Sequence, residues 1–387
     1  MLCPLLSPPS RRVNRRGFCF SGLALCLACV STLATAATPN IVLITADDQD
    51  WRDFSFTGTS GVLDTSGNPV RPYTPTIDTL FENGVTYSMG HCPVGVCRPS
   101  LTSIFTGLNP MQSGTYGNDP VVNGTAYGWG QNQDTIYNDV MRRNVELNPT
   151  LPRLLAEKGY VSLQTGKWWE GDPKRAGFTN AETGYETTNA DRHLHNYTDN
   201  GANSIGRFAG SVASRIGPFV DSAVAANKPF FISYAPMLPH LPHDTTPTSF
   251  KSRYQGLVDQ GKITTYQRDY LACVDWFDST IGEVRTLLQN KGVDNNTLYV
   301  FLADNGWLQT TGSAGPFGAD GGKLTSKEDG VRTPIIFYQN GQITDSRSVA
   351  AKLADARLAS STDIMPTLLS LVGATVPKSP VGRCSRL

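Results

Sequence analysis

The sequence predicts an α/β fold, a three-layer sandwich in which helices cover both faces of a mainly parallel central sheet. Short apolar runs rich in Val, Ile, Phe and Tyr alternate with longer stretches in which apolar residues recur every three or four positions. The short runs are typical of strands buried on both faces, and the longer stretches are typical of amphipathic helices. Because the two patterns alternate and no repeat is visible, we expect one α/β body and exclude a coiled coil or a disordered chain.

Five strands are expected from the apolar runs at residues 41–44, 160–163, 230–234, 298–302 and 334–337. Helices are expected where Pro or a polar residue begins an amphipathic stretch and Gly ends it. These stretches are residues 75–84, 97–107, 150–159, 266–289 and 363–373. Residues 110–150 and 171–215 are rich in Gly, Asn and Thr and show little periodicity. We expect both segments to be long surface loops that shape a substrate cleft.

Residues 1–37 have the pattern of a signal peptide. Arginines at positions 11, 12, 15 and 16 precede an apolar run at 18–30 and small residues at 34–37, the order that a signal peptidase reads. The arginine pair at 15 and 16 fits a twin-arginine signal and a general secretory signal equally well. The apolar run is too short to span a bilayer, and no later window has the length of a membrane helix. We therefore expect a periplasmic or secreted protein without a membrane span.

The charges and cysteines exclude two further classes of protein. Lys and Arg total 33, Asp and Glu total 33, and no basic cluster follows the first sixteen residues, so we expect no nucleic-acid partner. Four of the eight cysteines lie within the predicted signal peptide, which leaves Cys92, Cys97, Cys273 and Cys384. Four cysteines in a chain of this length do not make a disulfide scaffold. A small-molecule or carbohydrate site is the remaining expectation.

Polar residues follow four of the expected strands, at the edge where the carboxyl ends of parallel strands meet. They are Asp47 and Asp48, Lys167, His240 and His243, and Asp304 and Asn305. Three carboxylates and an amide oxygen, without a set of His or Cys ligands, suit a hard cation such as Ca²⁺ and fit zinc poorly. Because adjacent like charges repel, two strand ends that both carry acidic residues favour a shared cation.

Each of these motifs also has a structural interpretation. The Asp47-Asp48 pair could cap a helix, and Asp304-Asn305-Gly306 is a common turn sequence. The two histidines could be satisfied imidazoles in a rigid proline loop. Cys97 begins an expected helix, where unpaired N–H groups favour a thiolate or a bound oxyanion, although a lone cysteine at a helix start is usually structural.

Six motifs in the same order resemble those of the type I, formylglycine-dependent sulfatases of the alkaline phosphatase superfamily. They are Pro39-Asn-Ile-Val-Leu-Ile-Thr-Ala-Asp47-Asp48, Cys97-x-Pro99-Ser100 ending in Thr106-Gly107, Thr165-Gly166-Lys167-Trp168, Pro239-His240-x-Pro242, Ala303-Asp304-Asn305-Gly306, and Lys323-x-x-x-x-Glu328-x-Gly330-x-Arg332-x-Pro334. The likeness covers residues 39–373. It implies an alkaline phosphatase-like domain over residues 38–373, followed by a short tail at 374–387.

The resemblance also implies residue roles and cofactors. In that family a formylglycine-generating enzyme oxidises the cysteine, and the hydrated aldehyde attacks the sulfate ester. Carried onto this chain, the catalytic residues are Cys97, His240, Lys167 and Lys323, and the Ca²⁺ ligands are Asp47, Asp48, the modified Cys97, Asp304 and Asn305. Lys167 and Lys323 would hold the sulfate, His240 would assist the leaving oxygen, and His243 is placed among the substrate-binding residues.

Three features depart from the family pattern. The modification signature Cys-x-Pro-x-Arg ends here in Leu101, and Arg98 lies about 100° away from that face of the expected helix. The position of the family's aldehyde-regenerating histidine is Trp169. Family members also usually have a small C-terminal subdomain, and we expect it to be missing or truncated here because only fourteen residues follow position 373.

The sequence therefore predicts an exported sulfatase that acts on a sulfated carbohydrate or another sulfate ester. Two alternatives stay open. One is a phosphoester hydrolase of the same superfamily, although two-metal members normally need several histidine ligands. The other is a catalytically impaired sulfatase-like protein that binds sulfated glycans, as Leu101, Trp169 and the short C-terminus suggest.

Overall fold

A computed structural model describes residues 38–118, 133–182, 212–241, 243, 246–307, 322–379 and 382–383. The predicted signal peptide at residues 1–37 and Cys384 lie outside the described residues.

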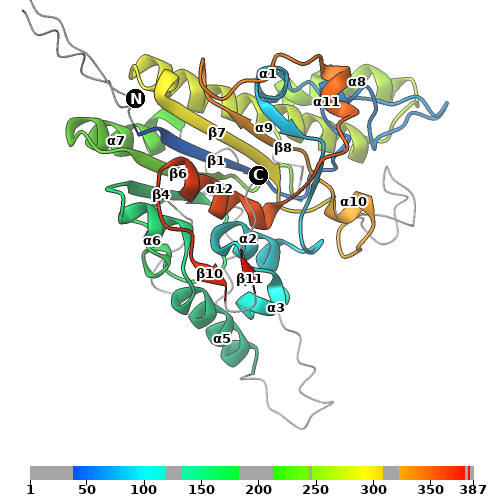
Figure 1. The fold of residues 1–387 in the computed structure, drawn as a ribbon. Helices are drawn as coiled ribbons and strands as arrows, with labels where there is room; N and C mark the ends of the chain where they lie inside the picture. The colour runs from blue at the N-terminus through cyan, green and yellow to red at the C-terminus, as the bar shows by residue number, and fades with distance from the viewer. Residues whose placement is uncertain are drawn as a thin grey trace, which may run out of the picture. The chain divides into compact units, whose positions relative to one another are not determined.

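A seven-stranded sheet in the order β2-β8-β7-β1-β6-β4-β5 forms the centre of the domain (Figure 1). Its strands are β1 (Asn40–Ala46), β2 (Val85–Tyr87), β4 (Val161–Gly166), β5 (Asn180–Glu182), β6 (Phe230–Ala235), β7 (Thr297–Ala303) and β8 (Ile335–Tyr338). The five strands from β7 to β5 are parallel, whereas β8 is antiparallel to both of its neighbours. The mainly parallel sheet predicted from the sequence is confirmed, with the ends of the expected strands shifted by at most three residues.

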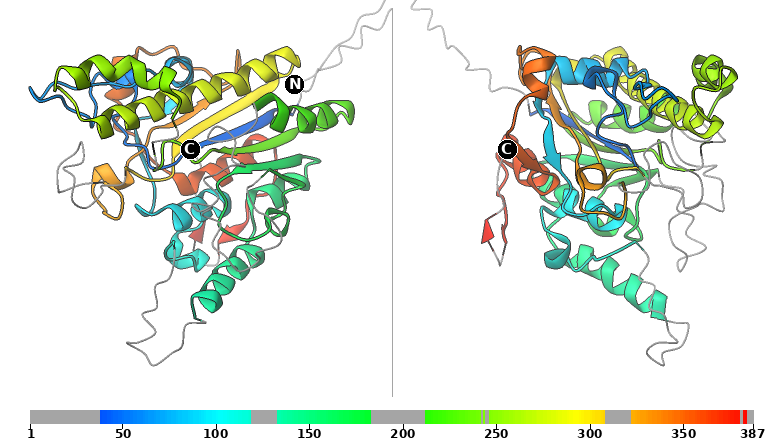
Figure 2. Two further views of the ribbon diagram at one scale, coloured as in Figure 1. Left: turned by 180° about the vertical axis from the view of Figure 1, so that it is seen from behind. Right: turned by 90° about the vertical axis from the view of Figure 1, so that its right-hand side faces the viewer.

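Helices cover both faces of the sheet (Figures 1 and 2). One face packs against α1 (Pro75–Asn83), α7 (Val212–Ala225) and α9 (Thr265–Asn290), and the other against α2 (Cys97–Thr106), α6 (Leu151–Ala156) and α12 (Ile364–Leu371). The other described helices are α3 (Pro110–Ser113), α5 (Gln133–Leu147), α8 (Thr248–Asp259), α10 (Glu328–Val331) and α11 (Val349–Leu353). Short strands pair as β3 (Met89–His91) with β9 (Leu358–Ser360) and β10 (Lys378–Ser379) with β11 (Gly382–Arg383).

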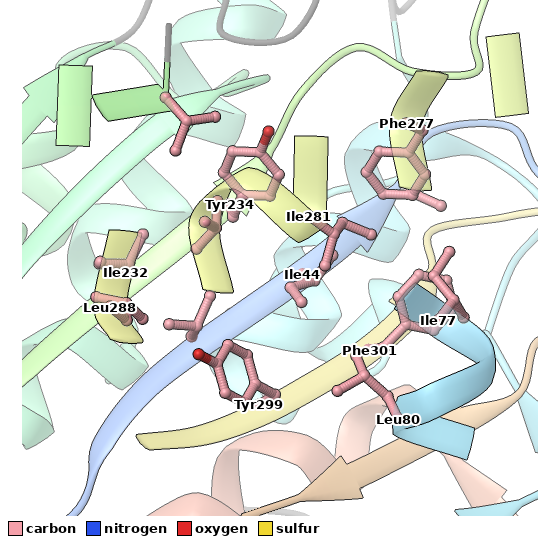
Figure 3. Close-up of a cluster of buried hydrophobic side chains, with 14 of the residues drawn as sticks. Ile44, Ile77, Leu80, Ile232, Tyr234, Phe277, Ile281, Leu288, Tyr299 and Phe301 are labelled. Carbon is pink, nitrogen blue, oxygen red and sulfur yellow. The ribbon is translucent and has the colours of Figure 1, made fainter. Parts of the chain in front are cut away.

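The continuous apolar strands are explained by burial on both faces. In β1, Val42 and Ile44 belong to the core under α9, whereas Ile41 and Leu43 belong to the core under α2. Figure 3 shows the first of these cores, in which Ile44 lies near Ile281 of α9. Successive side chains point to opposite faces of a strand, so a central strand in a sandwich is apolar at most of its positions.

The prediction that residues 110–150 form a long surface loop is wrong where the structure describes them. The segment contains α3 and the 15-residue helix α5. Of the α5 side chains described, Met141 and Val145 are buried, and they lie four residues apart. Nine of the fifteen α5 residues are polar or charged, and this composition favoured a loop over a helix in the sequence analysis.

The second predicted loop, residues 171–215, also contains regular structure. The edge strand β5 pairs with β4 in parallel, and α7 begins at Val212. A strand of three residues is held mainly by backbone hydrogen bonds to its neighbour. Its formation depends on where β4 lies and cannot be read from its own side chains.

None of the helices in the described ranges is long and apolar enough to cross a membrane.

Both ends of α1 are held by charged side chains from distant elements. Thr74 at the N-cap makes no side-chain capping bond, but the Asp278 carboxylate of α9 accepts hydrogen bonds from the N–H groups of Thr76 (3.0 Å) and Ile77 (2.7 Å). Burial raises the pKa of Asp278 to about 7. At the other end of α1, the buried Lys352 donates to three backbone carbonyls, those of Phe81 (2.9 Å), Glu82 (2.6 Å) and Gly84 (2.9 Å). These contacts satisfy groups that a helix leaves unpaired at its ends.

We expect Lys352→Met to lower the free energy of unfolding by about 3 kcal/mol, because three buried carbonyls would lose a charged donor. Urea unfolding followed by tryptophan fluorescence measures the change. Lys158→Met alters an exposed side chain and should change the same free energy by less than about 0.5 kcal/mol. Equal effects of the two substitutions would show that the Lys352 hydrogen bonds do not stabilise the fold.

Candidate active site

Four neighbouring parallel strands carry the predicted site residues at their carboxyl ends. Asp47 and Asp48 follow β1, Asp304 and Asn305 follow β7, Lys167 follows β4, and His240 lies beyond β6. The sheet order β7-β1-β6-β4 brings these four strand ends side by side at one edge of the sheet. The sequence predicts this convergence, because parallel strands place their carboxyl ends at a common edge.

The ends of β1 and β7 are locked together through Asp48. Its backbone adopts a positive φ of 60°, which is uncommon for a residue other than glycine. In this conformation its N–H donates to Asp304 Oδ1 at 3.1 Å, and its own Oδ1 accepts from Asn305 Nδ2 at 2.6 Å. The backbone turn after β1 therefore sets the relative positions of three predicted metal ligands.

Four side chains form a buried cluster that could hold a metal ion. One ligand atom from each of Asp47, Asp48, Cys97 and Asp304 lies within 4.8 Å of the others. Asp47 Oδ2 and Asn305 Oδ1 are buried and have no hydrogen-bond partner. Burial and the neighbouring Asp47 carboxylate raise the pKa of Asp304 to about 7. Carboxylates close together, with buried oxygens left unsatisfied, fit a hard divalent cation, which would stabilise their ionised forms.

Two lysines contact the same carboxylates. Lys167 Nζ lies 2.6 Å from Asp47 Oδ1 and 3.6 Å from an oxygen of Asp304, and Lys323 Nζ lies 2.8 Å from Asp48 Oδ1. Burial by itself lowers the pKa of each lysine, but the surrounding carboxylates outweigh burial and raise it. Both side chains are therefore ammonium ions near the cluster, as a site for an anionic group requires.

Cys97 is the first residue of α2, and its thiol points at the carboxylates. Sγ lies 3.5 Å from Asp48 Oδ1 and 3.9 Å from Asp47 Oδ1. The helix begins after the extended Val96 and ends at Gly107 in the left-handed region, as the sequence predicts. Burial raises the pKa of the Cys97 thiol well above its usual value. A thiolate, one of the two possibilities raised by the helix start, is thus disfavoured, because burial outweighs the helix dipole.

The two predicted histidines have different surroundings. His240 Nε2 lies 3.3 Å from Asp48 Oδ2, and its Nδ1 lies 2.7 Å from the Leu241 carbonyl. His243 Nε2 lies 2.8 Å from the Pro239 carbonyl, and the ring packs against Tyr266 and Tyr270 of α9. The structure therefore brings His240 to the carboxylates, whereas the substrate-binding role of His243 stays a prediction.

The positions that depart from the family signature are apolar here. Leu101 and Trp169 are buried in the same hydrophobic core as Cys97, and Lys167 Nζ lies 5.8 Å from the centre of the Trp169 ring. Arg98 does not replace the missing arginine at position 101. Its guanidinium instead forms a two-point contact with Glu170.

Two residues of the site were not singled out from the sequence. The Ser100 hydroxyl donates a hydrogen bond to the backbone carbonyl of Asp304 at 2.5 Å, and this bond connects α2 to the end of β7. Glu170 pairs with Arg98 although the two residues are 72 positions apart. In the sequence, Ser100 could have been noticed because it belongs to the cysteine motif. Glu170 could have been noticed because it is an acidic residue directly after two tryptophans.

Comparison with known proteins agrees with this geometry. A family model described as Sulfatase matches residues 39–374, most of the chain. The chain belongs to the sulfatase family. The resemblance inferred from the six motifs is confirmed, and so is the expected enzyme class, a sulfuric ester hydrolase.

Two curated relatives illustrate the distance within the family. This sulfatase is 28% identical to N-acetylgalactosamine-6-sulfatase of Mus musculus, over 93% of this chain and 68% of the relative. It is 26% identical to arylsulfatase A of Homo sapiens, over 92% of this chain and 68% of the relative. The chain thus spans about two thirds of the length of either protein.

Solved structures share the fold. The crystal structure of Ps i-CgsB in complex with k-i-k-neocarrahexaose has a TM-score of 0.62 and 22% sequence identity, and the match covers 88% of this chain and 73% of the other. This likeness confirms the predicted sandwich with a mainly parallel sheet.

We expect Asp304→Asn to weaken the binding of added Ca²⁺ at least tenfold, because the change removes a negative charge from a site built of carboxylates. Isothermal titration calorimetry on the metal-free protein measures the affinity. Asp64→Asn makes the same chemical change at a solvent-exposed turn and should leave the affinity unchanged. If neither the wild type nor Asp304→Asn binds Ca²⁺, the acidic cluster is not a calcium site.

Proposed function

We propose that this chain is an exported sulfatase that hydrolyses sulfate esters of carbohydrates, using a formylglycine made from Cys97 and a calcium ion. One observation carries the proposal. Cys97 Sγ lies 3.5 Å and 3.9 Å from the carboxylates of Asp48 and Asp47, and the Lys323 and Lys167 ammonium groups contact those same carboxylates. The nucleophile, the metal ligands and the anion-binding cations would therefore act at one point.

The residues available for calcium are the carboxylates of Asp47, Asp48 and Asp304, the Asn305 amide oxygen and the modified residue 97. When bound, the ion supplies positive charge that lowers the cost of ionising a hydroxyl group and of building negative charge on a sulfate ester. Formylglycine supplies a geminal diol, in which one hydroxyl can bond to sulfur and the other allows the aldehyde to re-form.

Lys167 and Lys323 are the groups of this chain that bind the sulfate. The side chains of Lys167 and Lys323 are only 2% and 6% exposed. Lys167 follows β4, whereas Lys323 lies in the segment that precedes α10, so two separate parts of the chain bring the two ammonium groups to the cluster. Charge stabilisation by fixed cations in a buried site is much stronger than in water. The two lysines therefore orient the ester and offset the charge that develops on its oxygens.

His240 is the proton donor to the leaving oxygen in this proposal. A hydrogen bond from Nδ1 to the Leu241 carbonyl, at 2.7 Å, would hold the ring with Nε2 directed toward the carboxylate cluster. In its imidazolium form the ring can keep this bond and still donate from Nε2. The contact between Nδ1 and the Leu241 carbonyl would thus orient the ring and leave Nε2 available to donate the proton.

Support for a carbohydrate substrate comes from the relatives and from the sequence. One relative is named for a sulfated amino sugar, and one structural neighbour binds a carrageenan oligosaccharide. Residues 1–37 have the pattern of a signal peptide and favour a periplasmic or secreted location, where the enzyme would encounter extracellular sulfated polysaccharides. A formylglycine-generating enzyme is the expected partner during maturation.

The phosphoester alternative fits the described site less well. Two-metal phosphatases need several histidine ligands, and His240 is the histidine that contacts the described carboxylate cluster. The binding-only alternative is favoured by a specific observation, the apolar residues Leu101 and Trp169 at positions where the family has arginine and histidine. The two tests below separate it from catalysis.

Co-expression with a formylglycine-generating enzyme should lower the mass of the peptide that contains residue 97 by replacement of H₂S with one oxygen atom. Peptide mass spectrometry measures this change, and a colorimetric aryl sulfate assay measures turnover in the same preparation. Cys97→Ala should abolish turnover while the protein stays folded, because the substitution is small. An active preparation that contains only unmodified cysteine would contradict the proposed nucleophile.

Trp169 predicts an unusual time course. If no other base replaces the family's histidine, the first step releases one alcohol per site in a burst and the second step then limits turnover. Trp169→His should raise the steady rate without changing the burst amplitude, as stopped-flow measurements of alcohol release would detect. Trp169→Phe is the matched control, because it keeps an aromatic ring without adding a base. A steady wild-type rate with no burst would mean that another base already regenerates the aldehyde.

A further inference from the structure

A buried ion pair connects two segments of the site that the reaction uses. Arg98 Nε lies 2.7 Å from Glu170 Oε1, and a terminal guanidinium nitrogen lies 2.7 Å from Glu170 Oε2. Arg98 is 1% exposed and Glu170 is 5% exposed, so both charges are withdrawn from water. The desolvation of two such charges cancels most of their attraction, and an apolar pair of similar volume would stabilise a fold as well or better. Stability alone therefore does not account for the pair.

The ends of the pair point to another role. Arg98 is the residue after Cys97 in the first turn of α2, and Glu170 is three residues after Lys167 beyond the end of β4. Lys167 Nζ contacts Asp47 Oδ1 at 2.6 Å, and Cys97 Sγ approaches the same oxygen at 3.9 Å. The ion pair thus joins the segment that carries the nucleophile to the segment that carries a sulfate-binding cation.

Further hydrogen bonds hold the Arg98 and Glu170 side chains in this orientation. Thr102 lies one turn after Arg98 on the same side of α2, and its hydroxyl donates to Glu170 Oε1 at 3.5 Å. The backbone N–H of Arg98 donates to Asn118 Oδ1 at 2.9 Å, and its guanidinium donates to the Asn118 carbonyl at 3.3 Å. A planar guanidinium held at two carboxylate oxygens restricts both distance and angle.

We propose that Arg98 and Glu170 are positioning residues that set the separation between residue 97 and Lys167 for sulfate transfer. The proposal rests on the function proposed above. Leu101 offers no charged contact from the side of α2 that faces the apolar core, so the ionic link between the helix and the Lys167 segment comes from Arg98. A misplacement of about 1 Å at reacting groups can reduce a rate by about a hundredfold, which is the physical reason for a rigid link.

The test replaces the pair by apolar side chains, since removing one partner alone would leave a buried unpaired charge and endanger folding. In Arg98→Met/Glu170→Leu we expect kcat per formylglycine site to fall at least tenfold, with KM for an aryl sulfate changed less than threefold and the thermal midpoint retained. Arg98→Lys keeps the charge but loses the two-point contact, and should have an intermediate kcat. Lys291→Met/Asp221→Leu is the matched control, because it removes both partners of an ion pair between the end of α9 and α7, two helices that pack on the opposite face of the sheet.

A second readout does not depend on activity. In protein made without the maturation enzyme, the rate of iodoacetamide labelling at Cys97, measured by peptide mass spectrometry, should rise at least tenfold in the double variant. Labelling of Cys273, which is buried in α9, should stay at the wild-type rate and exclude global unfolding. Unchanged labelling at Cys97 would overturn the positioning role. A wild type without sulfatase activity would instead count against the proposed function, while the labelling experiment would still decide the role of the pair.

Discussion

The structure of the site depends on the electrostatic cost of gathering three carboxylates in one buried place. Asp47, Asp48 and Asp304 are each at most 2% exposed, and like charges at such short range repel strongly. Lys167 and Lys323 offset part of this repulsion, but the pKa of Asp304 is still raised to about 7 by burial and the neighbouring carboxylate. The remaining negative charge suits a divalent cation, and the two ammonium ions suit an anionic ester. Both are requirements of metal-assisted sulfate chemistry.

The scaffold resists this repulsion by extending its backbone hydrogen bonds past the strand ends. The N–H of Asp304 bonds to the Ala46 carbonyl at 2.9 Å, and the N–H of Lys167 bonds to the Ala235 carbonyl at 2.7 Å. Asp304 and Lys167 are therefore still attached to a neighbouring strand where their side chains enter the site. Groups held in this way on a rigid sheet keep their separations when a substrate or an ion adds charge, which loop residues without such bonds could not do as well.

Around this charged cluster, the chain has apolar residues at two positions where the family signature has polar ones. The apolar side chains Leu101 and Trp169 are buried at positions where family members usually have charged or titratable groups. In α2 an ionic contact is found at Arg98, the residue after Cys97, and its partner Glu170 directly follows Trp169. The residues proposed to bind metal and sulfate can thus keep their arrangement while other side chains supply the contacts that support them.

The sequence by itself determined the five central strands and the convergence of acidic and basic residues, because strands buried on both faces contain apolar runs and parallel strands end at a common edge. It could not determine that Arg98 pairs with Glu170, that His240 lies against the Asp48 carboxylate, or that burial disfavours the Cys97 thiolate. It also missed α5 and β5. Strand and helix patterns are encoded by residues close in sequence. Ion pairs, burial and short edge strands depend instead on how segments far apart in the chain pack together, and only the tertiary structure decides that.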